Sequence, residues 1–142
     1  MGMSFLLDTH AFLWLIGEPE RVPEALVDRL ADEDNRLLVS AAAAMEVATK
    51  VRLGKLPTAA HLVAPAVWSA RVRDIGGEPL ELTAEHALLA GSLDWGHRDP
   101  FDRFLAAQAL IENAVLVTRD GAFAAVAGLR RAWDDEGHGT VW

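Results

Sequence analysis

The 142-residue chain contains no cysteine. This absence excludes disulfide scaffolds, thiolate metal sites and cysteine nucleophiles. It also suits a reducing compartment. The chain has no apolar run near the ~18 residues that a membrane-spanning helix needs. It has no positively charged N-terminal segment of the kind that begins a secretory signal. We therefore expect a cytoplasmic protein with no membrane-spanning segment.

Basic residues are scarce, because 13 Lys and Arg stand against 21 Asp and Glu, for a net charge of −8. This balance disfavours a general phosphate-binding surface. One segment differs, since residues 47–73 hold five basic side chains and no acidic one: Lys50, Arg52, Lys55, Arg71 and Arg73. The segment is either a basic strip for a polyanion or an ordinary solvated helix face.

Several well-known catalytic motifs are also missing. The sequence has no G-x-x-x-x-G-K-[ST] or G-x-G-x-x-G loop for nucleotide phosphates. Its five histidines show no H-x-x-x-H spacing, which disfavours a zinc site. No serine lies in a G-x-S-x-G setting, which disfavours a serine hydrolase.

What the chain does have is the composition of a globular protein, with 51% apolar and 24% charged residues. Its length predicts a single domain over residues 1–142. Short apolar runs predict strands at Ser4–Leu7, Leu37–Val39, Pro79–Leu82, Ala114–Val117 and, as a final edge strand, Thr140–Trp142.

Helical patterns lie between these runs. They cover His10–Ile16, Pro23–Asp32, a helix capped by Ser40 that ends near Leu53, Ala59–Ile75, a helix after Thr83, and Asp102–Asn113. Pro65 either kinks the Ala59–Ile75 segment or marks its true first turn. His86 stands where a capping box needs an acid or amide, so we expect that box to be incomplete. The alternation predicts an α/β fold with a parallel sheet and helices on both faces.

Acidic residues follow the predicted strands. Asp8 directly follows the first strand, Asp120 lies just past the fourth, and Glu46 lies two turns into the helix after the second. Asp102 opens the helix before the fourth strand, three residues after Asp99. Since the carboxyl ends of parallel strands meet at one sheet edge, these carboxylates are expected to converge there. A divalent cation such as Mg²⁺ or Mn²⁺ would relieve their repulsion.

Each acid also has a purely structural interpretation. Asp8 is suited to capping a helix. Glu46 can pair with Lys50 four residues later, and Asp99 and Asp102 are typical of a helix start. Asp120, followed by glycine, is typical of a turn.

Four segments resemble the PIN-domain family, and most closely the VapC-type toxins of bacterial toxin–antitoxin pairs. They are LLDTHAFLW (Leu6–Trp14), VSAAAAMEVATK (Val39–Lys50), HRDPFDRFLAAQAL (His97–Leu110) and LVTRD (Leu116–Asp120). The resemblance runs in the family's order from Leu6 to the closing TVW, and HRDPFDRFLAAQAL is its most specific part. The alanine run Ala41–Ala44 departs from the bulkier residues common before the family's glutamate.

The resemblance implies a three-layer α/β/α fold with about five parallel strands, and a Mg²⁺- or Mn²⁺-dependent ribonuclease. The family's catalytic acids map to Asp8, Glu46, Asp102 and Asp120, of which Asp8, Asp102 and Asp120 are the implied metal ligands. Thr9, Thr118 and Asp99 match supporting positions. The resemblance further implies a homodimer and a cognate antitoxin whose tail, often through an arginine, enters the acidic groove.

Basic side chains near these acids are candidates for RNA contact, namely Lys50, Arg52, Arg98, Arg103 and Arg119. Two alternative functions share parts of this pattern. A receiver-like phospho-acceptor needs an acidic pair after the first strand and a late lysine, whereas here Thr9 and His10 follow Asp8 and no lysine follows Lys55. A catalytically silent PIN-like protein that only binds RNA or a partner remains the main alternative.

Overall fold

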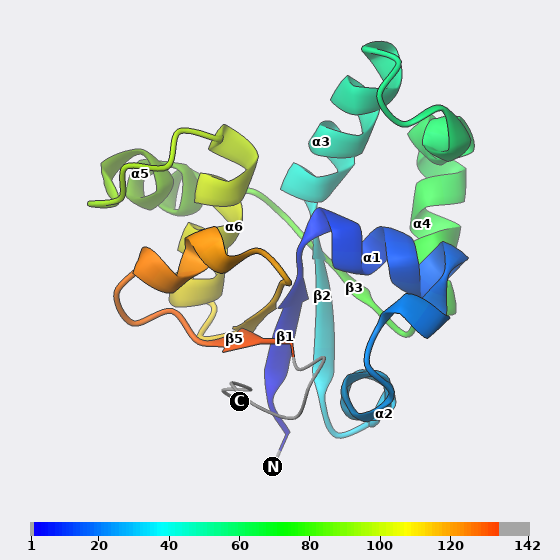
Figure 1. Cartoon of the computed structure of the whole chain (residues 1–142), viewed down its shortest axis with the longest axis horizontal. Helices are drawn as coiled ribbons and strands as arrows, with labels where there is room; N and C mark the ends of the chain where they lie inside the picture. The colour runs from blue at the N-terminus through cyan, green and yellow to red at the C-terminus, as the bar shows by residue number, and fades with distance from the viewer. Residues whose placement is uncertain (1, 134–142) are drawn as a thin grey trace.

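The computed structural model describes residues 2–133, which form a five-stranded parallel sheet in the order β3-β2-β1-β4-β5 (Figure 1). The strands are β1 (Ser4–Leu7), β2 (Arg36–Ser40), β3 (Glu78–Leu80), β4 (Val115–Val117) and β5 (Arg131–Ala132). The parallel five-stranded sheet is confirmed. The edge strand expected at Thr140–Trp142 lies outside the described residues, and the strand beside β4 is β5.

Helices occupy most of the chain between the strands. The α-helices are α1 (Thr9–Gly17), α2 (Glu24–Ala31), α3 (Ala41–Arg52), α4 (Pro65–Asp74), α5 (Ala84–Ser92) and α6 (Pro100–Ile111). Short 3₁₀ helices are η1 (Pro19–Arg21), η2 (Pro57–Val63) and η3 (Gly121–Ala125). Across the described part of the chain, no helix has the length and apolar character needed to span a membrane.

The central strands place alternate side chains on opposite faces of the sheet, as the twofold repeat of a strand requires. Phe5 and Leu7 pack on one face with residues of α1, α2 and α4. Leu6 packs on the other face with residues of α6 and η3. Both faces are therefore covered, which confirms the three-layer α/β/α architecture.

The structure decides two local expectations, the role of Pro65 and the capping box at Thr83. Pro65 is the first residue of α4 and follows η2, so it marks a true helix start and the Ala59–Ile75 segment is not one helix. The prediction that the capping box at Thr83 is incomplete is wrong, because both of its hydrogen bonds are present. The Thr83 hydroxyl accepts from the His86 backbone N–H at 3.2 Å, and Nδ1 of His86 accepts from the Thr83 backbone N–H at 3.1 Å. The imidazole nitrogen thus replaces the carboxylate or amide oxygen.

The strand order creates a switch point beside β1. From β1 the chain goes to β2 on one side, and it later returns to β4 on the other. In parallel sheets such a point, at the carboxyl ends of the strands, is where functional side chains gather. Asp8 follows β1 directly at this edge, where α3 also begins and where the first turn of α6 lies (Figure 1).

Candidate active site

Asp8 is a buried carboxylate at the end of β1, with 9% of its surface exposed. It caps α1, because Oδ1 accepts from the Ala11 backbone N–H at 2.8 Å. Burial raises the pKa of Asp8 to about 6, although the bonds from Ala11 and from the Thr118 side chain oppose this rise. The negative charge of Asp102 adds to it. The capping interpretation is confirmed, yet a cap alone does not require a carboxylate this poorly solvated.

Asp102 lies in the first turn of α6, partly buried. Burial is the main cause that raises its pKa, and the negative charges of Asp99 and Glu46 raise it further. Its Oδ2 lies 2.7 Å from Nε2 of His97, and this bond lowers the pKa. Asp8 and Asp102, 94 positions apart in the chain, are therefore close enough to interact electrostatically.

Glu46 is buried on α3, with 5% of its surface exposed. Its Oε1 accepts from the Thr9 hydroxyl at 2.5 Å, and its Oε2 pairs with Nζ of Lys50 at 2.6 Å. The expected i,i+4 pair with Lys50 is thus present, but it is not a surface contact. The Thr9 bond joins α1 to α3 and fixes the orientation of the Glu46 carboxylate toward the end of β1.

The remaining two acids are helix caps. Asp99 caps α6, since its Oδ1 accepts from the backbone N–H groups of Phe101 at 2.8 Å and of Asp102 at 3.2 Å. Asp120 is exposed and caps η3 through the Ala122 N–H. The Thr118 hydroxyl accepts from the Asp120 backbone N–H at 3.0 Å. Because Thr118 also bonds the Asp8 side chain, it links Asp8 to the turn that carries Asp120.

The donor set at this edge fits a hard divalent cation. Among residues 2–133, no three Asp, Glu or His side chains lie close enough to hold an ion by themselves. Mg²⁺, however, is usually held by one or two carboxylates and keeps several waters. Asp8 and Asp102 supply such carboxylates, and burial, which raises the pKa of each, leaves their ionised forms poorly solvated.

Five basic residues were predicted to contact RNA, and the structure gives them different surroundings. Arg52, Arg98 and Arg119 are exposed. Lys50 is half-buried in its pair with Glu46. Arg103 faces the protein, where its guanidinium donates to the backbone carbonyls of Ala90, Leu93, Trp95 and His97 at 2.7–2.9 Å. We therefore do not carry Arg103 forward as an RNA contact.

Arg103 holds the segment between α5 and α6, and its loss has a measurable consequence. We expect Arg103→Lys to lower the free energy of unfolding by about 2 kcal/mol, because an ammonium cannot reproduce the planar fork and leaves carbonyls unpaired. Urea denaturation measures this change. The exposed Arg98→Lys is the matched control and is expected to stay within about 0.5 kcal/mol of wild type. Equal midpoints for the two variants would contradict the assigned role.

Sequence reasoning missed two polar residues near the acids. His97 holds Asp102, and its ring lies 4.8 Å from that of Trp95, which in turn contacts Phe123 at 5.5 Å. Gln108 is fully buried on α6 and bonds Ser40. No motif spacing points to either residue. The only available signal was their presence inside HRDPFDRFLAAQAL, the most specific segment.

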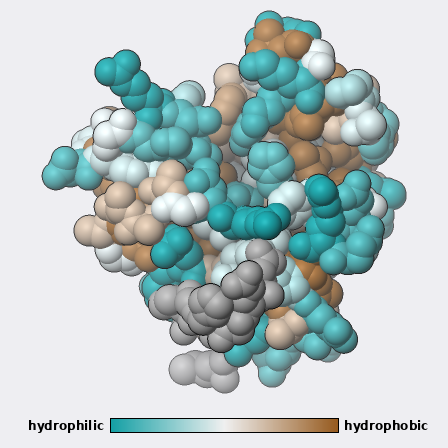
Figure 2. Space-filling view, viewed as in Figure 1, coloured by the Kyte–Doolittle hydropathy of each residue, from teal (hydrophilic) through white to brown (hydrophobic). Residues whose placement is uncertain are grey.

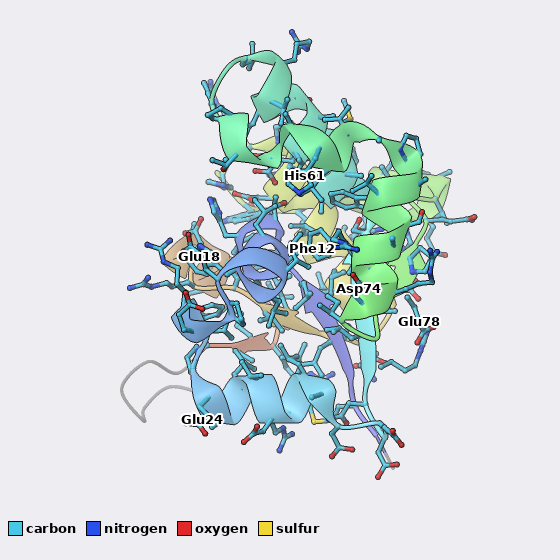
Figure 3. The ribbon with its side chains drawn as sticks, turned by 90° about the vertical axis from the view of Figure 1, so that its right-hand side faces the viewer. Phe12, Glu18, Glu24, His61, Asp74 and Glu78 are labelled. Carbon is cyan, nitrogen blue, oxygen red and sulfur yellow. The ribbon has the colours of Figure 1, made fainter. Side chains whose placement is uncertain are left out.

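A hollow of about 670 Å³ lies between α1 and η2. Its lining mixes apolar residues such as Leu13, Trp14, Ile16 and Leu62 with charged and polar ones, including Glu18, Arg21, Thr58, His61 and Arg71. Figure 2 shows apolar side chains gathered on this side of the molecule, over the arch of α3, η2 and α4. In the neighbouring stretch Phe12–Ile16, Phe12 is fully buried 4.8 Å from Trp68 of α4 (Figure 3), and Leu13–Ile16 are partly buried.

Comparison with known proteins identifies the family. The PIN domain family profile matches residues 5–129, so the chain belongs to the PIN domain family. A search of curated proteins finds no match to this chain.

Solved structures support the same fold. A chain of the VapBC2 structure from Rickettsia felis, solved with a DNA fragment from their promoter, is similar with a TM-score of 0.67 and 20% identity, over 93% of this chain and 100% of that one. DNA-bound VapBC from Salmonella typhimurium is similar with a TM-score of 0.63 and 21% identity, over 91% of this chain and 96% of that one. VapBC-1 from nontypeable Haemophilus influenzae is similar with a TM-score of 0.60 and 19% identity, over 91% of this chain and 96% of that one. At these identities the likeness concerns the fold.

Proposed function

We propose that this chain is a Mg²⁺- or Mn²⁺-dependent endoribonuclease and the toxin of a toxin–antitoxin pair. The observation that carries the proposal is the juxtaposition of Asp8, which is buried, and Asp102, which is partly buried, two carboxylates from distant elements near the carboxyl edge of the sheet. Membership of the PIN domain family and the likeness to VapBC structures support the same assignment. A bound divalent ion supplies a Lewis acid and a water of lowered pKa.

The residues around this pair have distinct proposed roles. Asp8 and Asp102 hold the ion, and Asp120 assists from the turn that Thr118 links to Asp8. Glu46, fixed by Thr9 and Lys50, orients the attacking water and accepts its proton, which is general base catalysis. Asp99 supports the site as the cap of α6. Arg52, Arg98, Arg119 and Lys50 contact the RNA backbone.

The partners follow from the same assignment. The positive side chain of an antitoxin arginine would complement Asp8 and Asp102, whose burial leaves their charges poorly solvated. We propose a homodimer in the cytoplasm, silenced when its cognate antitoxin occupies the acidic site. These partners rest on the family resemblance and on the VapBC likeness.

One observation favours the silent alternative, a PIN-like protein that only binds RNA or a partner. Glu46 already has two partners, Thr9 and Lys50, and Asp102 is bonded to His97. Incubation of purified protein with a pool of structured cellular RNAs in Mg²⁺, Mn²⁺ or EDTA separates the two functions. Cleavage that requires a divalent ion supports the nuclease. RNA binding without cleavage in either ion supports the silent protein.

The proposed RNA surface predicts a specific salt dependence. We expect Arg52→Gln with Arg98→Gln to weaken RNA binding in EDTA and to reduce the slope of log K against log salt by about 0.7 for each lost phosphate contact. Lys50 is left intact because its removal would also unpair Glu46. Arg73→Gln, exposed at the far end of α4, is the control. An unchanged slope in the double variant would remove Arg52 and Arg98 from the surface.

A further inference from the structure

Gln108 is a fully buried amide in an otherwise apolar stretch of α6. Its Oε1 accepts from the Ser40 hydroxyl at 2.5 Å, and its Nε2 donates to the Glu81 carbonyl at 3.2 Å. A buried amide is tolerated only when its polar atoms are bonded. The two partners therefore determine how the Gln108 side chain is oriented, and through it how α6 sits.

Ser40 is the last residue of β2 and the N-cap of α3. The same hydroxyl that donates to Gln108 accepts from the Ala42 backbone N–H at 2.9 Å. One buried oxygen thus joins the start of α3 to the middle of α6, across 68 positions of sequence.

The other side of Gln108 is supported from α5. Nδ1 of His86 accepts from the Thr83 N–H, so the ring proton is on Nε2, which donates to Glu112 at 2.9 Å. Nε2 of Gln108 lies 3.4 Å from that same Nδ1. The buried imidazole, 2% exposed, closes the space behind the amide and limits its alternative rotamers.

The contact joins the start of α3 to α6, and the two helices run in roughly opposite directions. The helix α3 leaves the carboxyl edge of the sheet, and α6 begins at that edge and leads back to the start of β4 (Figure 1). Glu46 lies six residues beyond Ser40, and Asp102 lies six residues before Gln108. At a rise of 1.5 Å per residue, each acid is about 9 Å from the contact along its own helix.

We propose that the Ser40–Gln108 hydrogen bond sets the spacing of α3 and α6, and that Gln108 is a positioning residue for the acids that those helices carry. A tilt of about 10° at the contact moves a group about 9 Å away by roughly 1.5 Å. Misplacement of about 1 Å at a catalytic site can reduce a rate by about a hundredfold. The activity consequence rests on the proposed ribonuclease function, whereas the helix spacing does not.

The activity test uses the intact protein with Mn²⁺ and RNA. We expect Gln108→Met, which keeps the side-chain volume and loses both bonds, to lower kcat roughly ten- to a hundredfold with KM little changed. Val27 is partly buried on α2, and Val27→Ala is the control for a loss of stability away from the contact. All variants are assayed under conditions in which circular dichroism shows that they are folded. An equal loss of kcat in Val27→Ala, or none in Gln108→Met, would overturn the proposal.

A second measurement does not depend on activity. Because the chain has no cysteine, spin labels can be placed at two well-exposed positions, by Met45→Cys on α3 and by Leu88→Cys on α5. The label on α5 follows the position of α6, because α5 packs against α6. We expect Gln108→Met to shift or broaden the distance distribution, and Val27→Ala to leave it unchanged. An unchanged distribution in Gln108→Met overturns the proposal. If wild type cleaves no RNA, the ribonuclease proposal fails, and the label distances alone decide whether Gln108 sets the helix spacing.

Discussion

Asp8→Asn is expected to reduce divalent-dependent RNA cleavage by about a thousandfold or more. Asparagine keeps the side-chain volume and can still accept from the Ala11 N–H as the cap of α1. It removes the negative charge that would hold the ion beside Asp102. Loss of Lewis-acid catalysis is worth several kcal/mol, and about 4 kcal/mol corresponds to about a thousandfold in rate. Gel or fluorescence assays of RNA cleavage in Mg²⁺ and Mn²⁺ measure it.

The matched control for this variant is Asp99→Asn. Asp99 also caps a helix through backbone N–H groups, so the substitution makes the same chemical change at the same kind of position. We expect its cleavage rate to stay within a few-fold of wild type. Equal activities of wild type and Asp8→Asn would show that Asp8 is only a structural cap. Equal losses in both variants would show that charge near α6, and not the Asp8 position, is what matters.

The same substitution is expected to stabilise the metal-free protein at pH 7 by about 3 kcal/mol. Burial raises the pKa of Asp8 from 3.8 to about 6, and each pH unit of difference is worth about 1.36 kcal/mol. The folded state binds this proton more tightly than the unfolded state, so stability is highest below about pH 4 and declines as the pH rises to about 6. The raised pKa of Asp102 acts in the same direction.

Urea denaturation between pH 3.5 and 7.5 in EDTA measures this dependence. Wild type is expected to lose stability through the window from pH 4 to 6, and Asp8→Asn to show a flatter profile that meets the wild-type curve at the acid end. Asp120→Asn, an exposed cap, should follow wild type. Addition of Mn²⁺ above pH 6 should restore stability to wild type and not to Asp8→Asn. Parallel profiles for wild type and Asp8→Asn would rule out a destabilising buried charge.

The sequence was sufficient for the sheet and most helices because their signals are local. The apolar run Ser4–Leu7 is followed by an acid, and β1 has those same bounds. Ser40 caps α3 as its residue type and position predict. The capping box at Thr83 was missed because the usual rule names carboxylates and amides, whereas the unprotonated Nδ1 of His86 accepts the same hydrogen bond. Whether Pro65 kinks or starts a helix depends on the packing of η2 and α4, which no local pattern specifies.

The candidate site was predicted less completely, because the partners of its side chains come from remote elements. Position after a strand was enough to select Asp8, and its cap was an explicit alternative. For Glu46 the structural interpretation, a pair with Lys50, and the placement at the candidate site are compatible, since the carboxylate pairs with Lys50 and is also buried. For Arg103, its position beside an acid in the sequence does not indicate that four backbone carbonyls accept from its guanidinium. The bonds of His97 to Asp102 and of Ser40 to Gln108 appear only once the helices are packed.

The central place of β1 in the sheet has a consequence for biosynthesis. During synthesis β1 can pair with β2 early, but its other neighbour, β4, begins 108 positions after Leu7, at Val115. Until then Asp8 lacks both the Val117 carbonyl that receives its N–H and the Thr118 side chain. A nascent chain that has emerged as far as Leu93 therefore contains Asp8 and Glu46 and no assembled acidic site. The protein's proposed chemistry is therefore withheld until β4 and Thr118 have been made, which gives a partner made alongside it time to be present.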